Sequence, residues 1–411
     1  MTKKNVLIIG AGGVAHAASH KLAQHNDLFG NIYLASRSID SCKKILDSIE
    51  RKNNYKNILN KIRMIHLDVF NNQDLDKILK KFKISITLNL ASPFCNMRIL
   101  QSCINNGSAY IDTAIHEDPS KVCEDPPWYA NYEWKHKTAC LQNGITAILG
   151  AGFDPGVVNA YVAYARKHYF DYIDTVDIMD VNAGIHNKYF ATNFDPEINF
   201  REFVKVWVWI NKQWECKPIH SEKKTYNFPV IGEQTIYLTG HDEIHSLYKN
   251  INATSIRFWM GFSEHYLNCF NVLSNIGLLS EKPVRTSEGL EVVPLKVLKA
   301  CLPNPKELAP NYTGKTCIGV LINGTWDKQK KEIFIYNICD HQSCYKEIES
   351  QAISYTAGVP AVSAAILINN GIWDVKKMVN IEELNPDPYI TLLKTMNLTT
   401  EIIEINKLSL I

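Results

Sequence analysis

The first apolar stretch of the chain is an unbroken run from Val6 to Ile9, followed at once by glycines. An unbroken run is typical of a strand that is buried on both faces of a parallel sheet. Similar runs recur up to residue 149, separated by segments with helical spacing, so the pattern predicts alternating strands and helices. The further strands are expected over 31–35, 63–69, 84–90, 105–112 and 144–149.

From about Asp174 onward, apolar and polar positions alternate instead, most clearly over 204–210. Alternation is typical of strands with one buried and one solvated face, which favours an antiparallel or mixed sheet. We therefore predict a second domain, for substrate binding and dimerisation. Its strands are expected over 204–210, 235–238, 255–260, 316–322 and 332–338, with a helix over 266–273 on one face.

Small residues dominate the stretch 351–371, which also contains Pro360. Small side chains let a helix approach its neighbours closely, so we expect a helix here that docks back on the first domain. A strand over 381–384 and a helix over 386–393 are expected to follow.

The glycines after the first strand follow the pattern G-x-G-x-x-A at Gly10, Gly12 and Ala15. Gly10 permits a tight turn, Gly12 lets the backbone approach a phosphate, and the next helix starts with free N–H groups. The pattern predicts a dinucleotide site, although a plain strand–turn–helix corner would share it. The expected cofactor contacts are Gly10, Gly12, Gly13, Val14, Ser36, Arg37, Asp68, Val69, Ala91, Ser92, Pro93, Asp112, Gly152 and Phe153.

The end of the second strand indicates which dinucleotide binds. Ser36 and Arg37 stand where an Asp or Glu would bind the 2′-hydroxyl of NAD. A hydroxyl and a guanidinium suit a 2′-phosphate instead, so we predict NADP(H). Two readings stay open: Asp40 lies close enough to keep NAD(H) in question, and Ser36 and Arg37 could simply cap and solvate the next helix.

Taken together, these patterns predict an α/β protein with a Rossmann-type doubly wound parallel sheet and a mixed or antiparallel α+β domain. The dinucleotide-binding domain is expected to comprise residues 1–125 together with 345–411. Residues 126–344 are expected to form the substrate-binding and dimerisation domain.

Composition excludes several classes of function. A net charge of +2 gives no nucleic-acid or membrane signature, and the start of the chain has no secretory apolar segment. Eleven scattered cysteines, an odd number, favour reduced thiols and a cytoplasmic protein. Cys339, His341 and Cys344 offer three groups without a nearby fourth, so we expect no metal site.

Several longer motifs resemble the carboxynorspermidine synthases, also called carboxynorspermidine or carboxyspermidine dehydrogenases, of the saccharopine dehydrogenase-like group. The resemblance covers nearly the whole chain. The first glycine motif is generic to dinucleotide folds, whereas the later motifs are specific. The motifs include GAGFDPGVVNAY at 150–161, FATNFDPEINFREF at 190–203, GHDEIHSL at 240–247 and DHQSCYKE at 340–347.

The resemblance implies a reaction and an assembly. NADPH would reduce the imine formed between L-aspartate β-semialdehyde and a diamine, either 1,3-diaminopropane or putrescine. The product would be carboxynorspermidine or carboxyspermidine, an intermediate of polyamine biosynthesis. Members of this group are commonly dimeric, so a homodimer is expected.

Such substrates need groups of both charges, because a carboxylate binds Arg or Lys and an ammonium binds Asp or Glu. Arg201 is our first candidate for the carboxylate, and Glu197 and Asp154 are candidates for the ammonium. His245 and Lys315 are candidates for moving a proton during imine formation. Each could equally be a structural residue. Further candidates are Arg257 and Lys315 for the carboxylate, Glu243 for the ammonium, and His186 and His341 for the proton.

Two other functions remain open. A saccharopine- or opine-type dehydrogenase would use an amino acid as its second substrate, and a sensor would bind NADP without turnover. The acidic residues near Glu197 favour a cationic second substrate over an amino acid.

Overall fold

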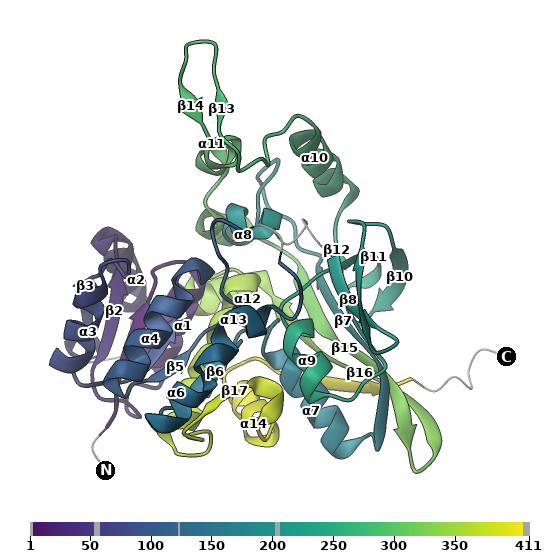
Figure 1. Cartoon of the computed structure of the whole chain (residues 1–411), viewed down its shortest axis with the longest axis horizontal. Helices are drawn as coiled ribbons and strands as arrows, with labels where there is room; N and C mark the ends of the chain where they lie inside the picture. Colours follow the sequence, from purple (N-terminus) through teal and green to yellow (C-terminus); the bar gives the residue numbers. More distant parts are fainter. Residues whose placement is uncertain (1–2, 53–57, 122–123, 202–205, 406–411) are drawn as a thin grey trace.

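The computed structural model describes residues 3–52, 58–121, 124–201 and 206–405. Two sheets stand side by side: a parallel sheet formed mainly by the N-terminal part, and a mixed sheet formed by the middle of the chain (Figure 1). The end of the FATNFDPEINFREF motif and the start of the strand predicted over 204–210 lie outside the described residues.

In the described part of the chain, the parallel sheet has seven strands in the order β17-β6-β5-β4-β1-β2-β3. Every neighbouring pair is parallel, which confirms the predicted doubly wound architecture. The strands are β1 (Asn5–Ile9), β2 (Ile32–Ser36), β3 (Ile62–His66), β4 (Ile84–Asn89), β5 (Ala109–Ile111), β6 (Ala147–Leu149) and β17 (Met378–Asn380).

Helices cover both faces of this sheet because successive strand side chains point to opposite sides. Val6 and Ile8 pack with α1, α2 and α13, whereas Leu7 and Ile9 pack with α3 and α4. The helices are α1 (Gly13–Gln24), α2 (Ile39–Arg51), α3 (Asn72–Lys81), α4 (Asn96–Asn106), α5 (Trp128–Asn131), α6 (Lys137–Gln142) and α13 (Ala352–Asn369).

Helix α13 docks on α1, as its small residues predict. A Cβ at Gly358 would lie 2.8 Å from the Cβ of Ala17, so only glycine allows this approach. The helix is long and apolar enough to span a membrane, but 83% of it is buried inside the fold. It is therefore a core helix of this structure.

The mixed sheet runs in the order β10-β11-β12-β7-β15-β16-β18, with β8 pairing to β12 and β9 to β8. Among the described strands of this mixed sheet, only β12 and β7 pair in parallel. Its strands are β7 (Tyr172–Asn182), β8 (Val206–Ile210), β9 (Gln213–Lys217), β10 (Lys223–Phe228), β11 (Gly232–Thr239), β12 (Ser255–Gly261), β15 (Lys315–Trp326), β16 (Gln329–Asp340) and β18 (Glu401–Glu404).

The remaining helices surround the mixed sheet or join it to the parallel sheet. The α-helices are α7 (Val157–His168), α8 (Pro196–Arg201), α9 (Ile244–Asn250), α10 (Glu264–Asn275), α11 (Pro294–Cys301), α12 (His341–Ile348) and α14 (Asp387–Thr395). The 3-10 turns are η1 (Ile58–Asn60), η2 (Pro93–Cys95), η3 (Glu133–His136), η4 (Pro305–Asn311) and η5 (Ile381–Glu383).

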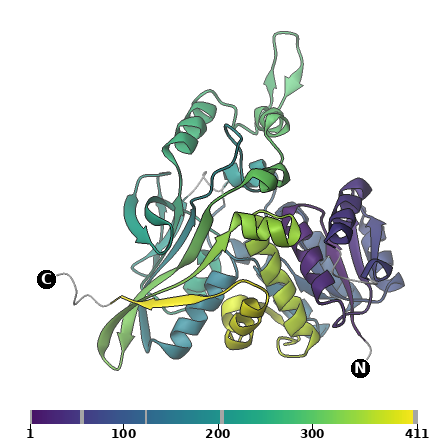
Figure 2. The ribbon, with the colours of Figure 1, turned by 180° about the vertical axis from the view of Figure 1, so that it is seen from behind.

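Strand membership differs from the predicted domain bounds in two places. β6 belongs to the parallel sheet although it lies after residue 125, and β18 belongs to the mixed sheet although it lies after residue 345. Figure 2 shows β18 running along the mixed sheet towards the C-terminus. The terminal strand predicted over 381–384 is also wrong, because those residues form η5 and the strand is β17, just before them.

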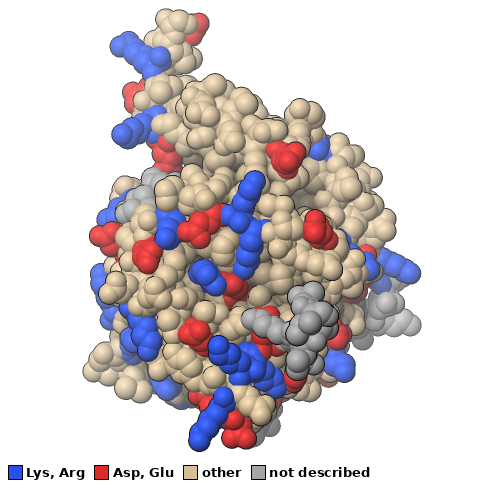
Figure 3. All heavy atoms as spheres, turned by 90° about the vertical axis from the view of Figure 1, so that its right-hand side faces the viewer, with Lys and Arg blue, Asp and Glu red and all other residues tan. Residues whose placement is uncertain are grey.

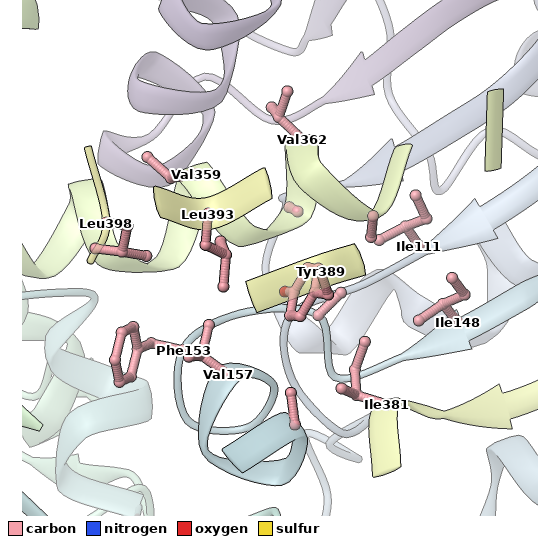
Figure 4. Close-up of a cluster of buried hydrophobic side chains, with 14 of the residues drawn as sticks. Ile111, Ile148, Phe153, Val157, Val359, Val362, Ile381, Tyr389, Leu393 and Leu398 are labelled. Carbon is pink, nitrogen blue, oxygen red and sulfur yellow. The ribbon is translucent and has the colours of Figure 1, made fainter. Parts of the chain in front are cut away.

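The two sheets share one hydrophobic core. Figure 4 shows Ile111 and Ile148 of the parallel sheet close to Tyr389 of α14 and Val362 of α13, with Val157 of α7 nearby. The same buried cluster extends to strands of the mixed sheet. A shared core fixes the two sheets relative to one another, and so fixes the walls of whatever lies between them.

A hairpin of β13 (Val284–Arg285) and β14 (Glu291–Val292) projects from the body above α10 and α11 (Figure 1). We call residues 264–301, from α10 through this hairpin to α11, the projecting arm, and several of its large apolar side chains are exposed, among them Ile276 at 63% and Leu290 at 65%. Elsewhere, on the face drawn in Figure 3, Lys and Arg lie interspersed with Asp and Glu.

Candidate functional site

A cavity of about 920 Å³ lies where the loops at the carboxyl ends of the parallel strands meet the mixed sheet. This edge is where ligands bind in open α/β sheets, and the volume is at the upper end for ligand pockets. Along the sheet edge, β1, β4 and β5 stand between β2 and β6. At a spacing of about 4.8 Å per strand, the cavity therefore extends for about 19 Å.

The glycine corner of β1 and α1 lines this cavity and fits a pyrophosphate. Gly10 has φ of +117°, and a Cβ there would lie 2.3 Å from the carbonyl oxygen of Leu90. Gly12, in contrast, has no atom within 4 Å of where its Cβ would be, so its Cα faces open space. Gly12 is also the N-cap of α1 and offers no side-chain cap, which leaves the first N–H groups of the helix for an anion.

The adenosine end of the cavity lies after β2. Ser36, Arg37 and Ser41 line it, as the prediction of a 2′-phosphate site requires. The hydroxyl of Ser38 caps α2 by accepting a hydrogen bond from the N–H of Ser41 at 3.2 Å. Ser38, and not Ser36 or Arg37, therefore caps the N-terminus of α2.

Most of the predicted cofactor contacts lie together on the cavity wall, and two do not. Asp112 is buried beneath the wall, where its carboxylate accepts a hydrogen bond from the N–H of Gly150 at 2.7 Å. Burial raises the pKa of Asp112 to about 7. Asp68 accepts a hydrogen bond from the N–H of Phe70 and also does not line the cavity. Those that line it are Gly10, Gly12, Gly13, Val14, Ser36, Arg37, Val69, Ala91, Ser92, Pro93, Gly152 and Phe153.

The other end of the cavity is acidic. Asp154 follows β6, Asp180 lies on β7, Asp242 follows β11 and Glu117 follows β5, and all four line the wall. Burial raises the pKa of Asp180 and of Asp242 to about 6, and the pKa of Glu117 to about 7. Carboxyl groups held this way are poised to gain or lose protons near neutral pH.

Asp154 and Asp180 form a carboxyl pair. The two carboxyl groups lie close enough to interact directly, and burial disfavours two negative charges side by side. The outer oxygens, Oδ2 of Asp154 and Oδ1 of Asp180, are buried from solvent. Because like charges in contact repel, such a pair favours one charged and one protonated carboxyl group.

His241 lies beside these carboxyl groups on the cavity wall. Its Nδ1 is 2.5 Å from Oε2 of the fully buried Glu243, and its ring stacks on Phe258 at 4.0 Å between centroids. A carboxylate behind an imidazole fixes the ring and stabilises its protonated form, an arrangement suited to acid–base work.

Arg201 of α8 lines the cavity, but its guanidinium already has partners. It binds Glu281 in a bidentate pair at 2.8 and 2.9 Å, and Glu117 at 3.2 Å. It also donates to the backbone carbonyls of Asp118 and Pro119. A substrate carboxylate would have to replace one of these acceptors.

Two family profiles match the chain. Residues 6–148 match the saccharopine dehydrogenase NADP binding domain, and residues 152–399 match the saccharopine dehydrogenase C-terminal domain. The chain belongs to the saccharopine dehydrogenase family. As a member of this family it is an NADP-dependent oxidoreductase that acts on CH–NH bonds, and the carboxynorspermidine synthase resemblance of its motifs is confirmed.

Relatives of this family member match over their full length. Carboxynorspermidine synthase from Vibrio alginolyticus is 43% identical, with 97% of each chain covered. Carboxyaminopropylagmatine dehydrogenase from Synechocystis sp. is 41% identical, with 96% of each chain covered. Among solved structures, apo saccharopine dehydrogenase (L-Glu forming) from Saccharomyces cerevisiae superposes with a TM-score of 0.70 at 14% identity, which shows the shared fold.

Three predicted catalytic residues lie outside the cavity of this family member. His245 is fully buried, its ring stacks between Trp128 and Trp214, and burial lowers its pKa to about 3, so its predicted role as a proton shuttle is corrected. Glu197 lies 3.2 Å from Lys299 in an ion pair, and Lys315 starts β15. Asp154 and Arg201 are the two that the fold brings to the cavity.

The further candidates have structural partners instead. Arg257 pairs with Asp177 at 2.7 Å, and His341 binds Asn182 and the N–H of Ala352. His186 accepts a hydrogen bond from a backbone N–H in its own loop. Within the described ranges, no three His, Cys, Asp or Glu residues are grouped so as to hold a metal ion.

Sequence reasoning missed four groups of the acidic end: Glu117, Asp180, Asp242 and His241. The motif GHDEIHSL drew attention to the segment that holds two of them, but not to these positions. For Asp180 the signal was an aspartate between the apolar residues Met179 and Val181, which normally requires a functional or ion-paired role.

Proposed function

We propose that the protein catalyses the NADPH-dependent reductive condensation of L-aspartate β-semialdehyde with a diamine, 1,3-diaminopropane or putrescine, to carboxynorspermidine or carboxyspermidine. The observation that carries the proposal is the charge distribution of the cavity. Carboxyl groups that can bind a cation lie at the end remote from Ser36 and Arg37. The names of the two Vibrio relatives support the same reaction.

The acidic end explains why the amine partner is cationic. A diamine attacks the aldehyde through one neutral amine while its distal ammonium stays charged. The carboxyl pair of Asp154 and Asp180, with Asp242 beside it, offers the negative charge that this ammonium needs. An amino acid would instead bring a carboxylate to this end, and repulsion would disfavour it.

Imine formation also needs an acid. The carbinolamine loses its oxygen as water, so a proton must reach that oxygen. In this proposal His241, held by Glu243, donates the proton, and the carboxyl pair resupplies it. The bound cofactor supplies the hydride that reduces the carbon–nitrogen double bond.

Arg201 remains our candidate for the α-carboxylate of the aldehyde. Of its acceptors, Glu117 is the one most easily replaced, because burial raises the pKa of Glu117 to about 7 even beside the guanidinium. Protonation of Glu117 would free one N–H group while the bidentate pair with Glu281 keeps the guanidinium in place.

The proposal is tested by following NADPH absorbance with aspartate β-semialdehyde and a panel of amines. Turnover is expected with 1,3-diaminopropane or putrescine. Agmatine belongs in the panel as a second candidate, because one relative is a carboxyaminopropylagmatine dehydrogenase and a guanidinium suits the same carboxyl groups. Turnover with glutamate or lysine alone would favour a saccharopine-type enzyme, and tight NADPH binding without turnover would favour a sensor.

The KM for the amine is expected to fall about tenfold between about pH 5.5 and 7.5. The carboxyl groups of Asp180 and Asp242 have pKa values raised to about 6, so they are mainly neutral at the lower end of this range and charged at the upper end. The diamine stays cationic throughout. A KM that is flat over this range would contradict the assignment, and Asp242→Asn should remove part of the pH dependence.

We further propose a cytoplasmic homodimer. The exposed apolar side chains of the projecting arm, such as Ile276 and Leu290, support association through that region. A second copy would cover side chains that the body of the molecule leaves in solvent.

A further inference from the structure

Five Lys and Arg side chains line the cavity, and they differ in their partners. Three of them form ion pairs with carboxylates. Arg37 and Lys306 have no carboxylate partner among the residues that the structure describes, and these two belong to the nucleotide half of the cavity. The paired ones are Lys121 with Glu124, Arg201 with Glu281 and Lys299 with Glu197.

Lys306 reaches the nucleotide corner from a distant part of the chain. It lies on η4, which follows the projecting arm, and its ammonium donates a hydrogen bond to the carbonyl of Ala11, between Gly10 and Gly12. Its backbone is held by Asn304, whose side chain accepts a hydrogen bond from the N–H of Lys306 at 3.1 Å. The lysine is therefore directed at the phosphate-binding corner.

The surroundings of Lys306 disfavour its charge. The side chain is half-buried, and burial together with the positive charge of Lys44 lowers its pKa. A carbonyl oxygen alone is a weak partner for an ammonium group in such a position. An anion bound beside it would restore the charge and offset the cost of burial.

The groups near Lys306 are suited to a phosphate. Lys306 is close enough to Lys44 of α2 to interact electrostatically with it, and Ser36, Arg37 and Ser41 line the cavity beside the start of that helix. We propose that Lys306 binds the 2′-phosphate of NADP(H) together with Arg37, Ser36 and Ser41, so that recognition of this phosphate involves both the parallel sheet and the segment after the arm. A dianion then has a lysine, an arginine and two hydroxyl groups as partners.

The test measures binding of 2′,5′-ADP and 5′-AMP to the full chain by calorimetry, without substrates. Lys306→Ala is expected to weaken 2′,5′-ADP binding about 10- to 100-fold and to change 5′-AMP binding less than about twofold. Lys306→Arg should retain most of the affinity. Lys43→Ala is the matched control, because Lys43 is exposed on α2 and does not line the cavity.

An equal loss for both nucleotides, or no loss for either, would overturn the assignment. If circular dichroism shows that Lys306→Ala does not fold, the same two binding measurements are made with Lys306→Gln and judged in the same way. The inference rests on the cofactor and not on the proposed aldehyde and amine. A failure here therefore leaves the condensation reaction open, and a failure of that reaction leaves this phosphate contact open.

Discussion

Gly12→Val is expected to abolish NADPH binding, with a loss of about 100-fold or more, while the protein still folds. No atom lies within 4 Å of the position of a Cβ at Gly12, and the backbone there, at φ of −79°, suits any residue. The valine side chain would fill the space that the phosphates need. Calorimetric titration with NADPH measures the loss, and Gly12→Ala should give a smaller loss of the same kind.

Gly10→Ala is the matched contrast. It requires a Cβ 2.3 Å from a backbone oxygen at a positive φ, so it should destabilise the fold by about 2–4 kcal/mol. Urea unfolding of both variants separates the two effects, with Gly12→Val expected within about 1 kcal/mol of the parent protein. Normal NADPH affinity in Gly12→Val would contradict the placement of the phosphates.

Asp154→Asn is expected to lower kcat/KM for the amine about 100- to 1,000-fold. The substitution keeps the shape of the side chain, but removes the charge and the shared proton of the pair with Asp180. Because Asp154 lies at the acidic end, the affinity for NADPH should stay within about twofold of the parent value.

Asp387→Asn provides the control for this variant. Asp387 carries the same group on the surface of α14, where it pairs with Lys167 and His168. Its replacement should leave kcat/KM unchanged. If Asp154→Asn and the parent protein have equal kcat/KM values, the carboxyl pair does not bind the amine.

The parallel sheet could be predicted because its signals are local. Each strand is an apolar run of a few residues, and the glycine turn after β1 marks the dinucleotide corner directly in the sequence. β7, in contrast, did not stand out, although it is central to the mixed sheet. Asp177 and Asp180 make its sequence look too polar for a buried strand. Only the fold shows that Arg257 and Lys224, from other strands, neutralise Asp177.

The candidate site divides in the same way. The nucleotide half is formed by residues that directly follow strands, so their positions could be predicted. The acidic half is assembled from four separate segments, and sequence spacing does not show that Glu117, Asp180 and Asp242 meet. Arg201 lies on the cavity wall, but its pairing with Glu281, eighty residues away, is visible only in the fold.

The late position of β17 in the chain affects how the protein folds while it is being synthesised. β17 pairs with β6, and these two strands are separated by the whole mixed sheet apart from β18. A ribosome releases the chain from its N-terminus, so the edge of β6 stays open until nearly all of the protein has emerged. A nascent or truncated chain that ends before β17 therefore exposes a bare strand edge, which is a template for aggregation and a target for chaperones.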